Sequence, residues 1–136
     1  METLVVIKPD AIEKNLIGKI ISIFELEGFS IVDMAMLNLS RKDAEDFYIT
    51  HKGKDFFERN IDFIVSGPIV AMVLRCDETD IITRVREIIG STVDADPWTI
   101  RGKFGVWNER TLVHASDSSK AFDWEIDVLT RRERGE

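Results

Sequence analysis

The chain of 136 residues has one cysteine, three prolines and no apolar run long enough to cross a membrane. Cys76 cannot form a disulfide within the chain, so we expect a reducing compartment and a small buried thiol without a redox role. The N-terminal residues lack the basic stretch and apolar segment of a signal peptide. These shortages together predict a cytoplasmic protein with no membrane association.

The chain also has fewer basic than acidic residues: 18 Lys and Arg compared with 25 Asp and Glu, which gives a net charge of -7. This charge disfavours general or specific binding to nucleic acid, so an anionic ligand would need a local basic cluster. One cysteine and two histidines give no zinc-ligand spacing. The glycine-rich phosphate loops G-x-x-x-x-G-K-[ST] and G-x-G-x-x-G are absent as well. We therefore expect no protein-bound metal and no phosphate loop of these two kinds.

The length and apolar content of the chain predict a single domain that spans residues 1–136, with a polar tail from about residue 130. Apolar runs predict strands at residues 4–7, 29–38 and 69–74, and a strand end at residues 112–113. Helical spacing predicts a helix from residue 17 that stops at Gly28, short helices within 40–60, and a helix over 81–89 capped by Asp77 or Thr79. This order predicts a ferredoxin-like α/β sandwich with four mainly antiparallel strands. A doubly wound parallel sheet is the alternative.

Residues 91–108 show no periodicity, and a loop of this length is usually functional or a contact between subunits. The segment contains Trp98 and Trp107. We expect these two side chains either to anchor an interface or to pack in the core, with no preference between the two.

The stretch from Arg110 to Ser118 is where we expect chemistry, because His114 follows a short apolar run and precedes residues that start helices. In the next helix, Glu125 lies three and four residues from apolar neighbours, which predicts that its carboxylate points inward. A buried carboxylate needs a polar partner, and His114 or a nearby serine could supply it. A purely structural histidine is the alternative. His51 lacks such a setting and is predicted to lie on the surface.

Four motifs then carry a resemblance to the nucleoside diphosphate kinase family, from about Thr3 to Leu129. They are the segments 6–11 (VIKPDA), 65–69 (VSGPI), 99–102 (TIRG) and 114–118 (HASDS), in the family's order and approximate spacing. The resemblance implies a ferredoxin-like core and transfer of the γ-phosphoryl group of ATP, or another nucleoside triphosphate, to nucleoside diphosphates. The implied route is ping-pong through a phosphohistidine, with Mg²⁺ carried by the nucleotide phosphates.

The same resemblance implies roles for individual residues. His114 matches the phosphorylated histidine, supported by Glu125 and Ser116, and Phe56 matches the aromatic that stacks on the base. Lys8 matches a lysine that contacts the ribose hydroxyl and the transferring phosphate. The remaining matches form the phosphate-binding group: Tyr48, Arg86, Thr92 and Arg101.

The chain also departs from the family pattern. Thr111 stands where the family has an asparagine near the ribose, which predicts altered discrimination between ribo- and deoxyribonucleotides. Ala115 replaces the commoner glycine, Asn60 occupies an apolar position beside the base, and Ser91 replaces a usual glutamate. The loop after Thr92 is about two residues shorter than is common, so the expected homo-oligomer could be a tetramer or a hexamer.

Two other functions compete with a kinase. A non-catalytic nucleotide-binding or sensing module on the same fold is the first alternative, because a fold does not imply an activity. A hydrolase that uses Ser116 as nucleophile is the second, although no nucleophile-elbow glycines flank a serine.

Overall fold

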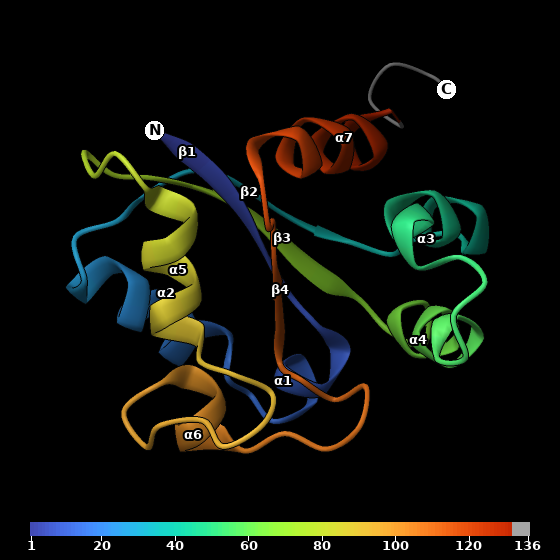
Figure 1. The fold of residues 1–136 in the computed structure, drawn as a ribbon, viewed down its shortest axis with the longest axis horizontal. Coiled ribbons are helices and arrows are strands. Elements are labelled where there is room, and N and C mark those ends of the chain that lie inside the picture. Colours follow the sequence, from blue (N-terminus) through green and yellow to red (C-terminus); the bar gives the residue numbers. More distant parts are fainter. Residues whose placement is uncertain (132–136) are drawn as a thin grey trace.

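In the computed structural model, which describes residues 1–131, a four-stranded antiparallel sheet has helices on both faces (Figure 1). This arrangement confirms the predicted ferredoxin-like sandwich. The elements are β1 (Glu2–Ile7), α1 (Pro9–Glu13), α2 (Ile17–Leu26), β2 (Ser30–Leu37), α3 (Arg41–Phe47), the 3₁₀ turn η1 (Ile49–His51), α4 (Phe57–Ile64), β3 (Ile69–Arg75), α5 (Ile81–Ile89), α6 (Ile100–Phe104), β4 (Val113–Ala115) and α7 (Ser119–Thr130).

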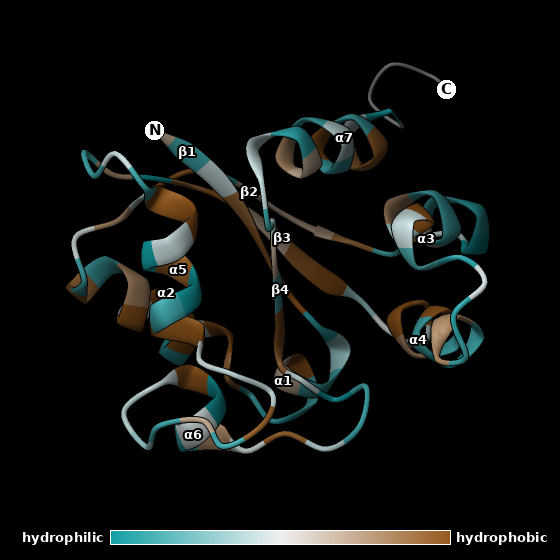
Figure 2. Ribbon diagram, viewed as in Figure 1, coloured by the Kyte–Doolittle hydropathy of each residue, from teal (hydrophilic) through white to brown (hydrophobic). Residues whose placement is uncertain are grey.

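The strand order is β2-β3-β1-β4, so β1 is central and pairs with β3 on one side and β4 on the other. Alternate side chains of a strand point to opposite faces. Val5 and Ile7 pack in the core with α2 and α5, whereas Leu4 and Val6 pack with α3, α4 and α7. Figure 2 shows the apolar strands between these two groups of helices. The continuous apolar run of β1 is thus explained by burial on both faces, as predicted.

Helix ends follow local sequence signals, with one correction. Gly28 and Gly90 adopt φ of 93° and 88° after α2 and α5, and a side chain at Gly90 would also clash with Thr99. The predicted cap of α5 was wrong: Asp80, not Asp77 or Thr79, accepts a hydrogen bond from the Thr83 N–H at 3.1 Å. The helix begins directly at Ile81, so the residue just before that buried isoleucine is the cap.

The predicted loop 91–108 contains the short helix α6, which sequence periodicity did not reveal. Thr99 caps it by accepting a hydrogen bond from Gly102 N–H at 3.0 Å, and Ile100 is fully buried. Five residues are too few for an amphipathic repeat to show. Trp98 and Trp107 are 60% and 68% exposed in the chain, so the core alternative is wrong for both, and an interface role stays a prediction.

At the C-terminus, α7 ends at Thr130, and the rest of the predicted tail, from residue 132, lies outside the described residues. Within residues 1–131, the helices are too short or too polar to span a bilayer.

Candidate active site

A cleft of about 580 Å³ opens beside β4, and eight of the ten residues singled out from the sequence line it. They come from well-separated parts of the chain: Lys8, Tyr48, Phe56, Arg86, Thr92, Arg101, Thr111 and His114. The other two, Ser116 and Glu125, are buried next to His114, and the Ser116 hydroxyl donates a hydrogen bond to the Glu125 carboxylate.

His114 lies in the middle of β4, where α7 brings Glu125 against its ring. Glu125 Oε2 is 3.0 Å from His114 Nε2, and Oε1 accepts a 2.6 Å hydrogen bond from the Ser116 hydroxyl. Glu125 is 6% exposed, so the inward orientation predicted from its helical spacing is confirmed. A carboxylate can only accept hydrogen bonds, so in the neutral imidazole this geometry places the proton on Nε2 and leaves Nδ1 with a lone pair.

Two aromatic rings hold the imidazole from the α3 side. The ring centroids of Phe47 and Tyr48 lie 5.0 and 5.6 Å from that of His114, both in edge-to-face geometry. Burial, and next the charge of Glu125, raise the pKa of Tyr48, so its phenol keeps its proton at neutral pH. His114 is therefore fixed in orientation by Glu125 and by the rings of Phe47 and Tyr48.

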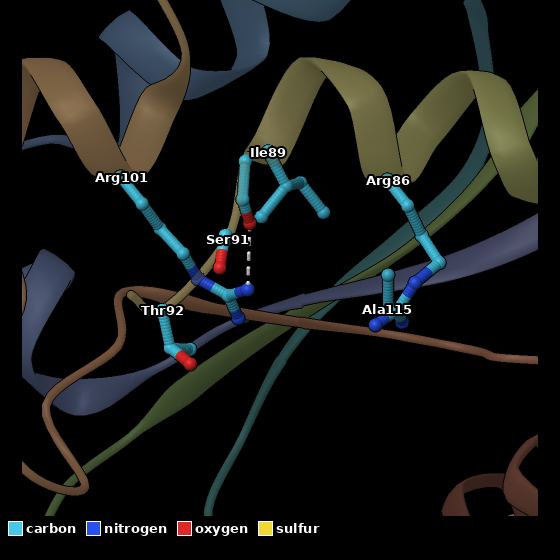
Figure 3. A pocket seen from close by; sticks show the side chains of 7 residues that line it. Arg86, Ile89, Ser91, Thr92, Arg101 and Ala115 are labelled. Atoms are coloured by element: carbon cyan, nitrogen blue, oxygen red, sulfur yellow. Dashed lines mark hydrogen bonds between the residues drawn. The ribbon is translucent and has the colours of Figure 1, made fainter. Parts of the chain in front are cut away.

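A basic group faces the histidine from α5 and α6. Figure 3 shows Arg86 and Arg101 extending from two helices into one pocket, with Ser91 and Thr92 close to Arg101. Burial, with Arg86 as a second cause, lowers the pKa of Arg101 to about 10, which still leaves it charged at neutral pH. These side chains form the local basic cluster that an anionic ligand would need in a chain with a net negative charge.

Arg101 also has a structural role that its sequence position did not reveal. Its guanidinium donates to three backbone carbonyls at 3.0, 3.0 and 2.8 Å, those of Thr111, Gly90 and Val113. These bonds tie the end of α5 to the strand that carries His114. One side chain in the cleft wall therefore also stabilises the position of β4.

Lys8 sits where β1 ends and is 9% exposed. Its ammonium donates to the carbonyl of Glu109 at 2.6 Å and to the hydroxyl of Thr111 at 3.0 Å. Burial is the largest influence on this group and lowers its pKa to about 8, while the carboxylates of Asp10 and Glu109 partly oppose the shift.

The lowered pKa of Lys8 predicts a pH dependence. Below about pH 8 the ammonium is charged and can attract phosphates, and above it the charge is lost, so kcat/KM should fall as pH rises through about 8. Bound phosphate groups would stabilise the charged form of Lys8, so we expect kcat to decline only at a higher pH than kcat/KM. Initial-rate profiles of the wild type and Lys8→Met check this, because the variant should lack the alkaline decline. The same decline in both proteins would contradict the assignment.

His51 is placed differently from the prediction. Rather than lying on the surface, it lines the cleft between Tyr48 and Phe56, with ring centroids 6.0 and 5.6 Å away, and its Nδ1 atom is buried without a hydrogen-bond partner. Burial first, and then the nearby charges of Lys54 and His114, lower its pKa. Its position three residues after Tyr48 and five before Phe56 was a signal that could have found it.

Asp10 is a second residue that sequence reasoning missed. It is 2% exposed, and its carboxylate accepts a 3.0 Å hydrogen bond from the backbone N–H of Leu112. Leu112 has φ of 73°, a strained value for a residue with a branched side chain. Asp10 thus stabilises the unusual turn that leads into the strand of His114.

Comparison with known proteins decides the family. The family model described as nucleoside diphosphate kinase matches residues 1–134. The chain belongs to the nucleoside diphosphate kinase family. Among curated relatives, the nucleoside diphosphate kinase of Methanococcus maripaludis is 46% identical over 132 residues, covering 96% of this chain and 98% of that protein. The enzyme of Methanocaldococcus jannaschii is 44% identical over 133 residues, covering 96% and 94%.

A solved nucleoside diphosphate kinase has the same fold. The structure of the Aquifex aeolicus enzyme matches with a TM-score of 0.87 and 40% sequence identity, over 94% of this chain and 93% of that one. The family's mechanism passes through a phosphohistidine. Membership disfavours the hydrolase alternative, and the geometry agrees, because Ser116 is 1% exposed and its hydroxyl is committed to Glu125.

Proposed function

We propose that the protein transfers the γ-phosphoryl group of ATP, or of another nucleoside triphosphate, to nucleoside diphosphates by a ping-pong reaction through His114. One observation carries the proposal: the imidazole is fixed at Nε2 by Glu125 while its other edge faces a cleft with Lys8, Arg86 and Arg101. An oriented neutral imidazole is a good nucleophile, and a cationic cleft suits a polyphosphate.

In the first half-reaction, the lone pair on His114 Nδ1 forms a bond to the γ-phosphorus. The bond from that phosphorus to the β,γ-bridging oxygen breaks, and the nucleoside diphosphate leaves with the electron pair. In the second half-reaction, a terminal oxygen of another nucleoside diphosphate attacks the phosphohistidine, and the P–N bond breaks. In both half-reactions Glu125 accepts the hydrogen bond from Nε2–H, and its negative charge stabilises the positively charged imidazole that forms.

The cleft residues supply positioning and charge. Arg86, Arg101 and Lys8 neutralise the phosphates, while the hydroxyls of Thr92 and Tyr48 are available to the transferring group. Phe56, at the opposite end, offers an aromatic face on which any base could stack. Positioning and neutralisation are the main requirements of phosphoryl transfer.

Magnesium would arrive with the nucleotide, bound to its phosphates. Within residues 1–131, no three His, Cys, Asp or Glu side chains are grouped so that they could hold a metal ion. The cleft suits a Mg²⁺–nucleotide complex because its arginines and lysine can bind the phosphate oxygens that the metal leaves open. The metal supplies further neutralisation of the phosphates.

An initial-rate study tests this function directly. With Mg²⁺ present, varied ATP at several fixed GDP concentrations should give parallel reciprocal plots, and chelation of the metal should abolish turnover. A non-catalytic sensing module, the main alternative, would bind nucleotide without turnover. A protein that binds ATP but transfers no phosphate would overturn the proposal.

Thr111 is expected to alter sugar selectivity. Its hydroxyl accepts a hydrogen bond from Lys8 Nζ, so it lies where a lysine could also reach a ribose hydroxyl. A threonine is shorter than an asparagine, so we expect Thr111→Asn to change the ratio of kcat/KM for ADP over dADP severalfold. Rates measured with both acceptors in both proteins check this. The same ADP-to-dADP ratio of kcat/KM in the wild type and in Thr111→Asn would contradict this prediction.

Three further expectations remain proposals: that the chain works as a single domain over residues 1–136, that it assembles into a homo-oligomer, and that it acts in the cytoplasm. The exposed Trp98 and Trp107 support an interface in the region of α6. Light scattering by the purified protein would distinguish a tetramer from a hexamer.

A further inference from the structure

Asp10, on α1, carries a carboxylate that the phosphoryl-transfer steps above do not use. The residue is only 2% exposed. One carboxylate oxygen, Oδ2, accepts a 3.0 Å hydrogen bond from the backbone N–H of Leu112. The other oxygen, Oδ1, is buried and accepts no hydrogen bond within residues 1–131. A buried carboxylate with an unpartnered oxygen is costly unless nearby cations offset its charge.

The N–H group that Asp10 binds belongs to the peptide group between Thr111 and Leu112. The carbonyl of that same peptide group accepts a 3.0 Å hydrogen bond from Arg101 Nε. One peptide group is thus held between a carboxylate and a guanidinium, and both charges polarise it in the same direction. Leu112 lies two residues before His114, so this contact fixes the backbone that leads into β4.

Lys8 is bound to the same short segment. Its backbone N–H donates to the carbonyl of Leu112 at 2.9 Å, and its ammonium donates to the hydroxyl of Thr111 at 3.0 Å. The Asp10 carboxylate and the Lys8 ammonium are therefore held in a fixed relation by hydrogen bonds to two consecutive residues. Because both side chains are buried, little water weakens the attraction between their charges.

The charged groups that act on the Lys8 ammonium are Asp10 from α1, Arg101 from α6 and Glu109 from the turn before β4. Burial is the main cause of the lowered pKa of Lys8. The charge of Asp10 is the next influence and opposes that shift, while Arg101 adds to it and Glu109 opposes it less. The Glu109 carboxylate is also ion-paired with Arg59, at 3.2 Å. Asp10 is therefore the main anion that favours the charged form of Lys8.

We propose that Asp10 is a positioning residue for the phosphoryl transfer proposed above, and that it acts as the buried counter-ion of Lys8. The proposal rests on that function and adds a residue that acts through Lys8 rather than on the nucleotide. The charge of Asp10 favours the protonated ammonium, and its hydrogen bond holds the peptide group before β4. The two effects can be separated, because an asparagine amide oxygen can accept the same hydrogen bond without a charge.

The test compares the alkaline decline of kcat/KM for GDP in the wild type and in Asp10→Asn. Without the anion, burial and Arg101 favour the neutral amine, so Lys8 loses its proton at a lower pH. We expect the decline, which lies near pH 8 in the wild type, to move down by roughly one pH unit, the lower end of the effect of a nearby opposite charge. Glu13→Gln removes an exposed carboxylate from the same helix and should keep the wild-type profile.

A second measurement does not depend on catalysis. NMR of the Lys8 ε-carbon, assigned by the loss of its signal in Lys8→Met, follows the same titration without nucleotide. Its midpoint should move to lower pH in Asp10→Asn and stay in place in Glu13→Gln. If Asp10→Asn lowers kcat/KM equally at every pH and leaves the Lys8 midpoint unchanged, the role of Asp10 is purely structural and the proposal is overturned.

The double variant Lys8→Met, Asp10→Asn decides the matter if Asp10→Asn alone does not fold. Removing both charges should restore a folded protein if the carboxylate is the partner of Lys8, whereas a double variant that stays unfolded would contradict the proposal. A wild type that transfers no phosphate would contradict the proposed function instead, and the NMR titration would still decide whether Asp10 is the counter-ion of Lys8.

Discussion

Replacing His114 with alanine is expected to lower kcat for transfer from ATP to GDP by a factor of roughly 10⁴ or more, as loss of a covalent nucleophile does elsewhere. Without the imidazole, no covalent intermediate can form. Direct transfer would need two nucleotides at once in a cleft of about 580 Å³. A coupled assay of both proteins at saturating Mg²⁺–ATP measures the effect.

The variant must be shown to fold for this result to be informative. The His114 ring contacts Phe47, Tyr48 and Glu125, so its loss should leave the sheet intact. Circular dichroism and the urea midpoint provide that control. Activity of the folded variant within tenfold of the wild type would mean that another group carries the phosphate.

Replacing Arg101 with alanine is expected to have the largest effect on stability among the site residues. The substitution removes the donor from three backbone carbonyls, those of Gly90, Thr111 and Val113. Each carbonyl left unpaired and shielded from water costs about 1 kcal/mol or more, so we expect the free energy of unfolding to fall by roughly 3 kcal/mol. Urea denaturation of the purified proteins measures this loss.

Arg86→Ala is the matched comparison for Arg101→Ala. Arg86 faces the same space but is exposed, so its removal should lower kcat/KM and change the free energy of unfolding by less than about 0.5 kcal/mol. Arg101→Lys should recover some activity but little stability, because one ammonium cannot reach three carbonyls in different directions. Equal urea midpoints for Arg101→Ala and the wild type would contradict the bracing role.

The contrast between these two arginines shows where sequence reasoning works and where it stops. Glu125 could be predicted to point inward because the signal is local, in the spacing of apolar residues along one helix. The three hydrogen bonds that Arg101 donates to backbone carbonyls depend on how α5, α6 and β4 pack together. The spacing of residues along the sequence carries no signal of that packing. His51 is a different case, because its signal was local and was overlooked: the aromatic rings of Tyr48 and Phe56 that flank it come from either side of a short 3₁₀ turn.

The fold itself was largely predictable because burial on both faces gives β1 and β3 continuous apolar runs, and α2 and α5 each show one apolar face. The short helix α6 and the cap Asp80 were missed because a five-residue helix has no repeat and neighbouring polar residues could cap equally well. The pairing of Glu109 with Arg59 joins α4 to a turn 50 residues later, so it too is visible only in three dimensions.

The central claim, a phosphohistidine at His114, is tested most directly by incubating the purified protein with γ-labelled ATP and Mg²⁺. The account predicts one acid-labile, base-stable label per chain, which chases onto added GDP, is absent from His114→Ala and persists in His51→Ala. An acid-stable ester on a hydroxyl such as that of Ser116, or an unlabelled wild type that still transfers phosphate, would contradict it.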